Sequence, residues 1–244
     1  MRLSINPSYG SFGIAVEGRP WRLFGVAAIL GIATIMLMTG VSFAQTPPDG
    51  AKAVKLVVLG DSLTAGFGLA AQQAFPVRLQ KSLKDKGIAV DAVNAGVSGD
   101  TASGGRDRLD WSVPDGTQAV IVELGANDAL RGIDPAVTRS ALEEIIKKLQ
   151  GKGIAVLLCG MYAPRNFGPD YVAKFDPIYP DLAKTYRIPL YPFFLDGVAG
   201  ERQLTQADGL HPTAEGVDVI VTRILPTVEA FLGQLTGKPL APKG

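Results

Sequence analysis

Beyond residue 53 the chain alternates between short apolar runs and longer stretches in which apolar residues return every three to four positions. Short apolar runs are typical of strands buried in a parallel sheet, and the longer spacing is typical of helices that pack on one. The runs predict strands at residues 54–59, 88–93, 119–124, 154–159 and 188–192. The longer stretches predict helices at residues 75–86, 135–150, 171–186 and 212–235, with a weaker helix that ends near Trp111.

Prolines and apolar positions add detail to the predicted helices. Pro177 and Pro180 are expected to break the helix over 171–186 into pieces, because proline removes a backbone donor. Pro212 suits the first turn of the last helix, where that donor has no partner. One face of helix 135–150 is expected to enter the core, through Val137, Leu142, Ile145, Ile146 and Leu149.

Repeated alternation of strand and helix predicts an α/β protein. A parallel sheet with right-handed crossovers carries helices on both faces, so we expect a three-layer α/β/α sandwich around a five-stranded parallel sheet. We find no internal repeat and therefore predict one domain over residues 53–235. Residues 45–52 are interpreted as a linker and residues 236–244 as a flexible tail, because both are rich in proline and glycine.

The N-terminal region has the pattern of an export signal. Arg19 and Arg22 precede an uncharged run over residues 23–44, which ends in small residues. This order predicts cleavage after Ala44 and a periplasmic or secreted protein. The run is also long enough to span a bilayer, so an uncleaved membrane anchor is the alternative.

Composition narrows the possible partners. Lys and Arg number 24 against 23 Asp and Glu, a net charge of +1, and no basic patch indicates nucleic acid or an electrostatic membrane contact. Cys159, the single cysteine, cannot form an intramolecular disulfide and is interpreted as a small core residue, with a reactive thiol as the alternative. With one histidine and one cysteine, no metal site is expected. We expect a monomer.

Ser62 lies in a turn just after the first predicted strand, two residues beyond Gly60. Open α/β sheets bind ligands at the carboxyl ends of their strands, so this serine is a candidate nucleophile. A serine in such a turn more often caps a helix or hydrogen-bonds the backbone. The downstream sequence has to decide between the two.

His211 is the only histidine, so any serine–histidine mechanism must use it. Asp208 precedes it by three residues, across Gly209. A carboxylate so placed can accept the Nδ1 proton and orient the imidazole toward a nucleophile. The alternative for Asp208 is a carboxylate that interacts with a helix N-terminus.

Acyl transfer also needs hydrogen-bond donors for the developing oxyanion. Three candidates follow consecutive strands: the backbone N–H of Ser62, a glycine N–H in the turn over 94–101, and the side-chain amide of Asn127. Each residue is also common in ordinary turns. Their shared position at one edge of the sheet favours a catalytic interpretation.

Four sequence blocks occur here in the order and approximate spacing of the SGNH (GDSL) hydrolase family: Gly60-Asp61-Ser62-Leu63, Ser98-Gly99-Asp100-Thr101, Gly125-Ala126-Asn127-Asp128 and Asp208-Gly209-Leu210-His211-Pro212. The chain resembles most the bacterial periplasmic branch with acyl-CoA thioesterase, lysophospholipase and arylesterase activities. The resemblance covers essentially all of residues 53–235. Ala126 stands where many relatives have a second glycine. No Gly-x-Ser-x-Gly motif occurs, which argues against the α/β-hydrolase fold.

The resemblance implies a flavodoxin-like SGNH fold and a serine esterase that needs no cofactor and no metal. It implies Ser62 as nucleophile, His211 as base and Asp208 as its orienting carboxylate. Gly99 and Asn127 would complete the oxyanion hole with Ser62. Asp61 would contact these residues and not the substrate. The substrate would be a small ester or thioester of an acyl or aryl group.

The apolar and aromatic loop over residues 160–170 is a candidate cover for the acyl or aryl group, and the resemblance places a substrate-binding loop there. Its candidate contacts are Met161, Tyr162, Ala163, Pro164 and Phe167. The alternative is a loop that only packs on its own domain.

Three other functions are less well supported by the sequence. Gly66 and Gly68 fit a dinucleotide-binding Gly-x-Gly-x-x-Ala pattern, but they follow the strand too late for that motif. A non-catalytic exported binding module is disfavoured by the intact Ser62, Asp208 and His211. A carbohydrate O-deacetylase of the same superfamily is the serious competitor, although Trp111 is the only tryptophan outside the signal region to serve as a sugar platform.

Overall fold

The computed structural model describes residues 53–236. Five strands form one all-parallel sheet in the order β2-β1-β3-β4-β5. They are β1 (Val54–Gly60), β2 (Val90–Gly96), β3 (Ala119–Glu123), β4 (Ala155–Cys159) and β5 (Leu190–Tyr191). The expected α/β class and five-stranded parallel sheet are confirmed. The predicted export signal, its cleavage after Ala44, the linker and the tail beyond Thr236 lie outside the described residues.

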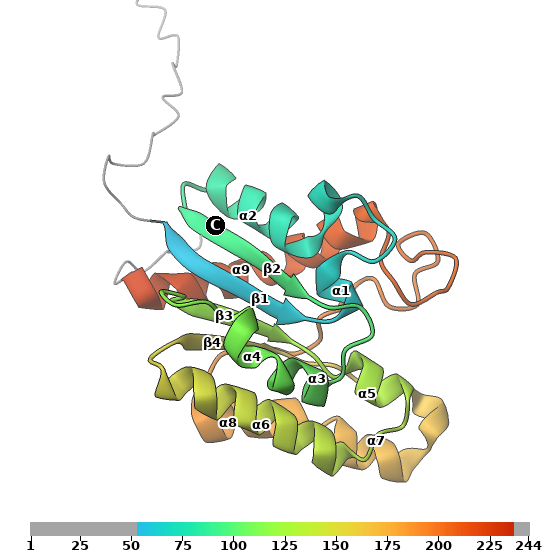
Figure 1. The fold of residues 1–244 in the computed structure, drawn as a ribbon. Coiled ribbons are helices and arrows are strands. Elements are labelled where there is room, and N and C mark those ends of the chain that lie inside the picture. The colour runs from blue at the N-terminus through green and yellow to red at the C-terminus, as the bar shows by residue number, and fades with distance from the viewer. Residues whose placement is uncertain (1–52, 237–244) are drawn as a thin grey trace, which may run out of the picture. The chain divides into compact units, whose positions relative to one another are not determined.

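Helices cover both faces of this sheet, as expected (Figure 1). One layer contains α2 (Phe75–Asp85) and α9 (Ala214–Thr236), which pack on each other. The opposite layer is built from α3 (Ala102–Asp107), α4 (Leu109–Ser112), α6 (Pro135–Gly151), α7 (Pro169–Phe175) and α8 (Ile178–Tyr186). Short helices follow β1 and β3 at α1 (Ser62–Ala65) and α5 (Ala126–Leu130). Single 3₁₀ turns lie between α1 and α2, at η1 (Ala71–Gln73), and after β4, at η2 (Arg165–Phe167).

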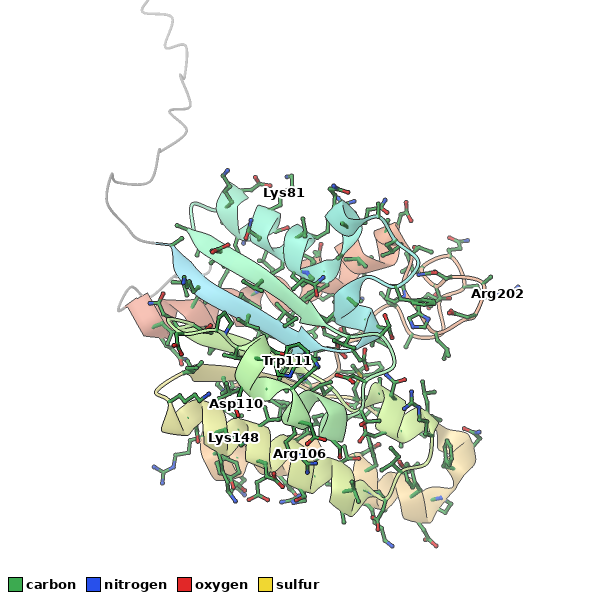
Figure 2. All side chains as sticks on the ribbon, in the orientation of Figure 1. Lys81, Arg106, Asp110, Trp111, Lys148 and Arg202 are labelled. Atoms are coloured by element: carbon green, nitrogen blue, oxygen red, sulfur yellow. The ribbon has the colours of Figure 1, made fainter. Side chains whose placement is uncertain are left out.

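The core lies between the three central strands and the two helix layers. Every residue of β3 is buried, as a strand with helices on both faces requires. On α6, Leu142, Ile145, Ile146 and Leu149 are buried as predicted, whereas Val137 is 47% exposed because it lies on the outer side of the first turns. Charged side chains such as Lys81 of α2 and Lys148 of α6 point away from the sheet (Figure 2).

Cys159 ends β4 and is completely buried. Burial raises the pKa of the Cys159 thiol well above its ordinary value, which keeps the thiol protonated. A buried, protonated thiol is a poor nucleophile. The interpretation as a core residue therefore holds, and a reactive thiol is disfavoured.

The second strand differs from its prediction over 88–93. β2 starts two residues later and continues to Gly96, paired with β1 through Asn94, Ala95 and Gly96. These residues look like turn formers in the sequence, but a side chain on Gly96 would lie 2.3 Å from the backbone nitrogen of Ala65. Gly96 is therefore needed for the close approach of α1 to the sheet rather than for a turn.

The last helix also begins later than predicted. α9 starts at Ala214, and Pro212 is not in its first turn but in an isolated antiparallel bridge with Thr205. The backbone N–H of Gln206 donates to the carbonyl of His211 at 2.7 Å, and its side chain donates to the carbonyl of Pro212. These bonds hold residues 211–213 extended, so the helix cannot begin there.

The remaining differences concern breaks within predicted elements. Pro177 separates α7 from α8 as predicted, but Pro180 lies in the first turn of α8 and breaks nothing. The weaker helix near Trp111 is two short helices, α3 and α4. The expected loop over 160–170 contains η2 and the start of α7, and the fifth strand has only two residues.

Candidate active site

Ser62 is placed by the end of the central strand β1. The strand stops at Gly60, and Asp61 caps the short helix α1 by accepting a hydrogen bond from the N–H of Leu63 at 2.9 Å. This cap fixes Ser62 as the first helical residue. Its side chain is directed into a cavity, and only 8% of the residue is exposed.

Asp208 and His211 lie on the loop between β5 and α9. The Asp208 Oδ1 atom accepts hydrogen bonds from the backbone N–H groups of Leu210 and His211, at 2.9 and 3.0 Å. Gly209 has a φ of 70°, a left-handed conformation that glycine adopts without strain. The tight turn brings the carboxylate beside the imidazole of the same loop.

The structure brings Ser62, Asp208 and His211 together in one chain of hydrogen bonds. His211 Nε2 lies 2.9 Å from Ser62 Oγ, and His211 Nδ1 lies 2.6 Å from Asp208 Oδ2. Hydrogen bonds from the His211 side chain and from the two backbone N–H groups lower the pKa of Asp208 to about 2. Because an ionised carboxylate only accepts, Nδ1 carries the proton and Nε2 is free to accept from the serine hydroxyl.

Asn127 comes from α5, just after β3. Gly125 precedes α5 with a φ of 111°, and a side chain there would strike the hydroxyl of Tyr179, which donates to the carbonyl of Leu124. The Asn127 Nδ2 atom donates to Asp61 Oδ2 at 3.0 Å. The amide is thereby held next to the turn that carries Ser62.

Gly99 is held in the loop after β2 with a φ of 84°. Its carbonyl accepts a hydrogen bond from Arg131 at 2.8 Å, and within residues 53–236 its N–H donates to no other group. Asp128 of α5 links that helix to the start of α3, just after the Gly99 loop, and to α6, because its buried carboxylate accepts from the N–H of Ala102 and the hydroxyl of Thr138. The loop of Gly99, which leads into α3, is thus held next to α5, which carries Asn127.

A second carboxyl group lies beneath Asp61. Burial raises the pKa of Asp61 to about 6, although hydrogen bonds from Leu63 and Asn127 oppose the rise. Glu123 is fully buried, and burial together with the neighbouring Asp61 raises its pKa well above the ordinary value. Thr64 donates to Glu123 Oε2 at 2.7 Å. Burial and the neighbouring carboxylate thus both favour the neutral form of Glu123 over its charged form.

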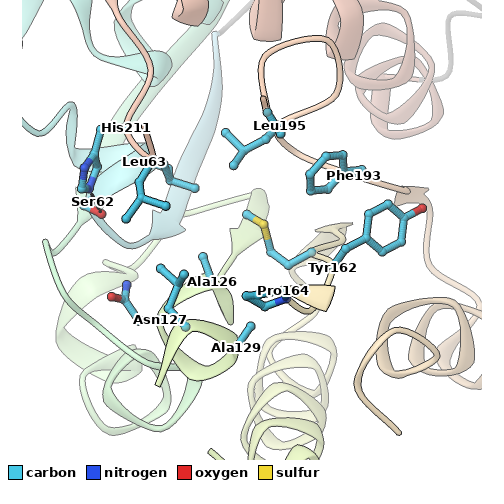
Figure 3. Close-up of a pocket in the computed structure, with 14 residues that line it drawn as sticks. Ser62, Leu63, Ala126, Asn127, Ala129, Tyr162, Pro164, Phe193, Leu195 and His211 are labelled. Atoms are coloured by element: carbon cyan, nitrogen blue, oxygen red, sulfur yellow. Dashed lines mark hydrogen bonds between the residues drawn. The ribbon is translucent and has the colours of Figure 1, made fainter. Parts of the chain in front are cut away.

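An apolar cavity of about 340 Å³ opens beside the serine. Ser62 and His211 lie at one end and the aromatic rings of Tyr162 and Phe193 at the other, with Leu195 and Ala126 between them (Figure 3). The rings of Tyr162 and Phe193 contact each other, with centroids 4.7 Å apart. The size and lining suit one apolar ligand group of modest length.

The residues proposed from the 160–170 loop divide into two groups. Met161, Tyr162 and Pro164 line the cavity. Ala163 and Phe167 do not line it: the Ala163 N–H donates to Asp176, and the Phe167 ring packs on Tyr171. Sequence reasoning missed a further set of lining residues: Leu63, Ala129, Leu130, Phe193, Leu195, Ala199 and Leu210.

A simple rule would have found part of that set. The segment with Phe193, Leu195 and Ala199 follows β5, so it emerges at the same sheet edge as the loops after the first four strands.

Within residues 53–236, no three histidine, cysteine or acidic side chains gather as metal ligands would. In that same range no helix has both the length and the apolar character to cross a membrane.

Residues 58–219 match the GDSL-like Lipase/Acylhydrolase family. The chain belongs to this family. Esterase TesA of Pseudomonas aeruginosa is 37% identical over 203 residues, which are 83% of this chain and 96% of the relative. A thioesterase 1/protease 1/lysophospholipase L1 of Escherichia coli is 39% identical over 68% of this chain and 78% of its own length.

Solved structures give the same assignment. The crystal structure of TesA superposes with a TM-score of 0.69 at 38% identity, covering 72% of this chain and 99% of that one. The SGNH-hydrolase family esterase AlinE4 superposes with a TM-score of 0.63 at 43% identity, covering 72% and 95%. The expected SGNH hydrolase fold is therefore confirmed, and the chain is an esterase of the SGNH type.

Proposed function

We propose that this esterase uses Ser62 as nucleophile, His211 as general base and Asp208 to orient the imidazole. The observation that carries the proposal is the continuous hydrogen-bonded chain from Ser62 Oγ through both ring nitrogens of His211 to Asp208. An ionised Asp208 stabilises the imidazolium that forms when Nε2 takes the serine proton.

The reaction follows from these positions. Ser62 Oγ attacks the ester or thioester carbonyl while its proton passes to His211 Nε2. The imidazolium then returns this proton to the leaving alcohol or thiol, and the acyl group stays on Ser62. Water, deprotonated by His211, attacks the acyl-enzyme and releases the acid, after which the serine regains its proton.

The oxyanion hole is proposed to consist of the N–H groups of Ser62 and Gly99 and the side-chain amide of Asn127. The Gly99 N–H has no other acceptor within residues 53–236, and Asn127 uses one amide hydrogen on Asp61 and keeps the other. Asp61 acts by holding this amide. Donors fixed before the reaction stabilise the tetrahedral intermediate without reorganisation.

The substrate is proposed to be an ester or thioester with an acyl or aryl group of modest size, which would occupy the apolar cavity with Met161, Tyr162 and Pro164 among its contacts. The relatives named esterase, arylesterase and thioesterase/lysophospholipase support this class. Neither cofactor nor metal enters the proposed steps.

A carbohydrate O-deacetylase is the competing activity within the family. Trp111, the tryptophan available as a sugar platform, is 73% exposed on α4 and does not line the cavity (Figure 2). The cavity walls are mainly aliphatic and aromatic, which favours acyl or aryl groups over sugars. A panel of acyl-CoA, lysophospholipid, aryl ester and acetylated sugar, compared by kcat/KM, decides between them.

We further propose that the protein is exported and acts as a monomer, outside the cytoplasm. The signal-like pattern before Ala44 supports export. Mass spectrometry of the protein recovered from the periplasm and medium tests this: an N-terminus at Gln45 supports cleavage, and an intact N-terminus in the membrane fraction favours the anchor.

The proposed nucleophile is tested by Ser62→Ala, with Ser140→Ala on the exposed face of α6 as the matched control. Hydrolysis of p-nitrophenyl butyrate by the first variant should fall to background in the presence of a chelator, and the control should keep full activity. Unchanged turnover in Ser62→Ala would remove the serine from the mechanism.

A further inference from the structure

Arg131 lies immediately after α5, which carries Asn127, and next to the loop that carries Gly99. It is exposed, and its Nη2 atom donates to the carbonyl of Gly99 at 2.8 Å. The same nitrogen lies 3.4 Å from Asn127 Oδ1. One guanidinium thus contacts both Gly99, in the loop after β2, and Asn127, in α5.

The contacts around Asn127 are complementary at its two ends. Its Nδ2 atom faces Asp61, a carboxyl group that accepts in its ionised form, and its Oδ1 atom faces Arg131, which can only donate. An asparagine amide has nearly the same shape after a half-turn, so neighbours must decide its orientation. An acceptor on one side and a donor on the other select the orientation with Nδ2 on the side of Asp61, which precedes Ser62, and Oδ1 on the side of Arg131.

No ion pair within residues 53–236 explains the position of the Arg131 side chain. In the part of the chain that the structure describes it forms no ion pair, unlike Arg139, Arg165 and Arg223, which each contact a carboxylate. Its two hydrogen-bond acceptors are both groups of the proposed oxyanion hole. An exposed arginine with such partners contributes little to global stability but fixes the Gly99 loop relative to α5.

We propose that Arg131 is a positioning residue that assembles the oxyanion hole. It fixes the Gly99 turn through its carbonyl and fixes the Asn127 amide through Oδ1, while Asp61 holds the other end of that amide. This inference rests on the proposed function, because it assumes that Gly99 and Asn127 stabilise the oxyanion. Arg131 itself does not contact the reacting atoms.

The test uses Arg131→Met and Arg131→Lys, with Arg139→Met on α6 as a control that removes the same charge far from the cavity. For the neutral substrate p-nitrophenyl butyrate, kcat of Arg131→Met should fall about tenfold with KM changed less than about twofold, because the lost stabilisation is confined to the transition state. Arg131→Lys should recover only part of kcat, since an ammonium lacks the planar fork of arginine. Arg139→Met should keep the original kcat, and thermal unfolding should be unchanged in all three variants.

A double-mutant cycle with Asn127→Ala makes the test specific. Asn127→Ala alone should lower kcat by about 10²–10³-fold, the loss typical of one oxyanion donor. In that background Arg131→Met should cost clearly less than tenfold, because the amide it orients is absent and only the Gly99 turn remains to be positioned. Affinity for a boronic acid, a mimic of the tetrahedral intermediate, should fall in proportion to kcat.

Different failures point to different errors. If Asn127→Ala leaves kcat unchanged, the proposed oxyanion hole is wrong and the role of Arg131 falls with it. If Asn127→Ala is impaired but Arg131→Met is not, or the two losses simply multiply, only the positioning role is overturned. A rise in KM for anionic acyl-CoA, with the neutral ester unaffected, would instead make Arg131 an anchor for a substrate phosphate and would also overturn it.

Discussion

The ring of Phe67 lies against the imidazole of His211, with centroids 4.5 Å apart and planes tilted by 37°. Phe67 belongs to the loop that follows α1, so the loop after the proposed nucleophile packs on the proposed base. The side chain of Gln206 strengthens this contact by donating to the carbonyl of Phe67 at 2.7 Å. His211 is therefore positioned by a ring contact and a loop contact as well as by Asp208.

Phe67→Ala should lower kcat/KM about two- to tenfold, because an aromatic pair contributes about 0.5–1.5 kcal/mol and its loss frees the imidazole to leave its hydrogen bonds. Trp111→Ala is the matched control, since it removes an exposed aromatic that does not line the cavity. Steady-state kinetics on a p-nitrophenyl ester checks both. Equal activities of the two variants would show that the ring contact does not position the base.

Phe193→Ala should lengthen the cavity at the end opposite the serine. Two further methylene groups could then be buried, each worth about 0.8 kcal/mol, so the kcat/KM ratio of decanoyl over butyryl ester should rise about tenfold. Phe193→Leu should give a smaller rise. A series of p-nitrophenyl esters measures the ratio, and an unchanged preference would mean that the acyl group does not reach this ring.

Gly96→Ala should destabilise the protein by about 1–3 kcal/mol or more, because the new methyl group would lie 2.3 Å from the backbone of Ala65 in α1. Activity should fall as well, since the displaced helix carries Ser62. Gly151→Ala at the end of α6 is the control: nothing lies within 4 Å of the added carbon, and the change should be neutral or stabilising. Urea unfolding of both variants measures the difference, and equal stabilities would contradict the close packing of α1.

Asp61 should make stability depend on pH in an identifiable way. Its pKa is raised from 3.8 to about 6 by burial, so the folded protein keeps a proton that the unfolded chain releases between about pH 4 and pH 6. This contribution to the free energy of unfolding is present below that window and is lost as the pH rises through it.

Asp61→Asn removes this contribution and retains a side chain that can cap α1. We compare the free energy of unfolding of the original protein with that of the variant. Their difference, original minus variant, should fall by on the order of 1–3 kcal/mol when the pH rises from 4 to 7. Urea unfolding at both pH values provides the measurement. A difference that does not vary with pH would indicate an ordinary carboxyl group at this position.

The sequence was most informative where one physical rule dominates. Residues 119–123 form a fully buried strand because helices cover both faces, and their apolar run shows this directly. The approach of His211 to Ser62 was predictable because the carboxyl ends of parallel strands share one edge of the sheet. Neither inference needed side-chain detail.

Predictions failed where contacts outside the helices and strands decide the outcome. Pro212 suits a helix start by its own preference, but the hydrogen bonds of Gln206 keep that segment extended. The contacts of Phe67 with His211 and of Arg131 with Gly99 join segments that no local pattern connects. Such contacts depend on the folded paths of two loops at once.

The hydroxyl and the imidazole of the proposed triad are separated by 149 positions, and the chain has no other histidine. During synthesis the serine therefore leaves the ribosome long before its base exists. Any product interrupted ahead of position 211 contains no imidazole at all and should be inert toward esters. Activity thus reports that the polypeptide was made at least as far as His211 and folded, so a simple ester assay separates such molecules from shorter products.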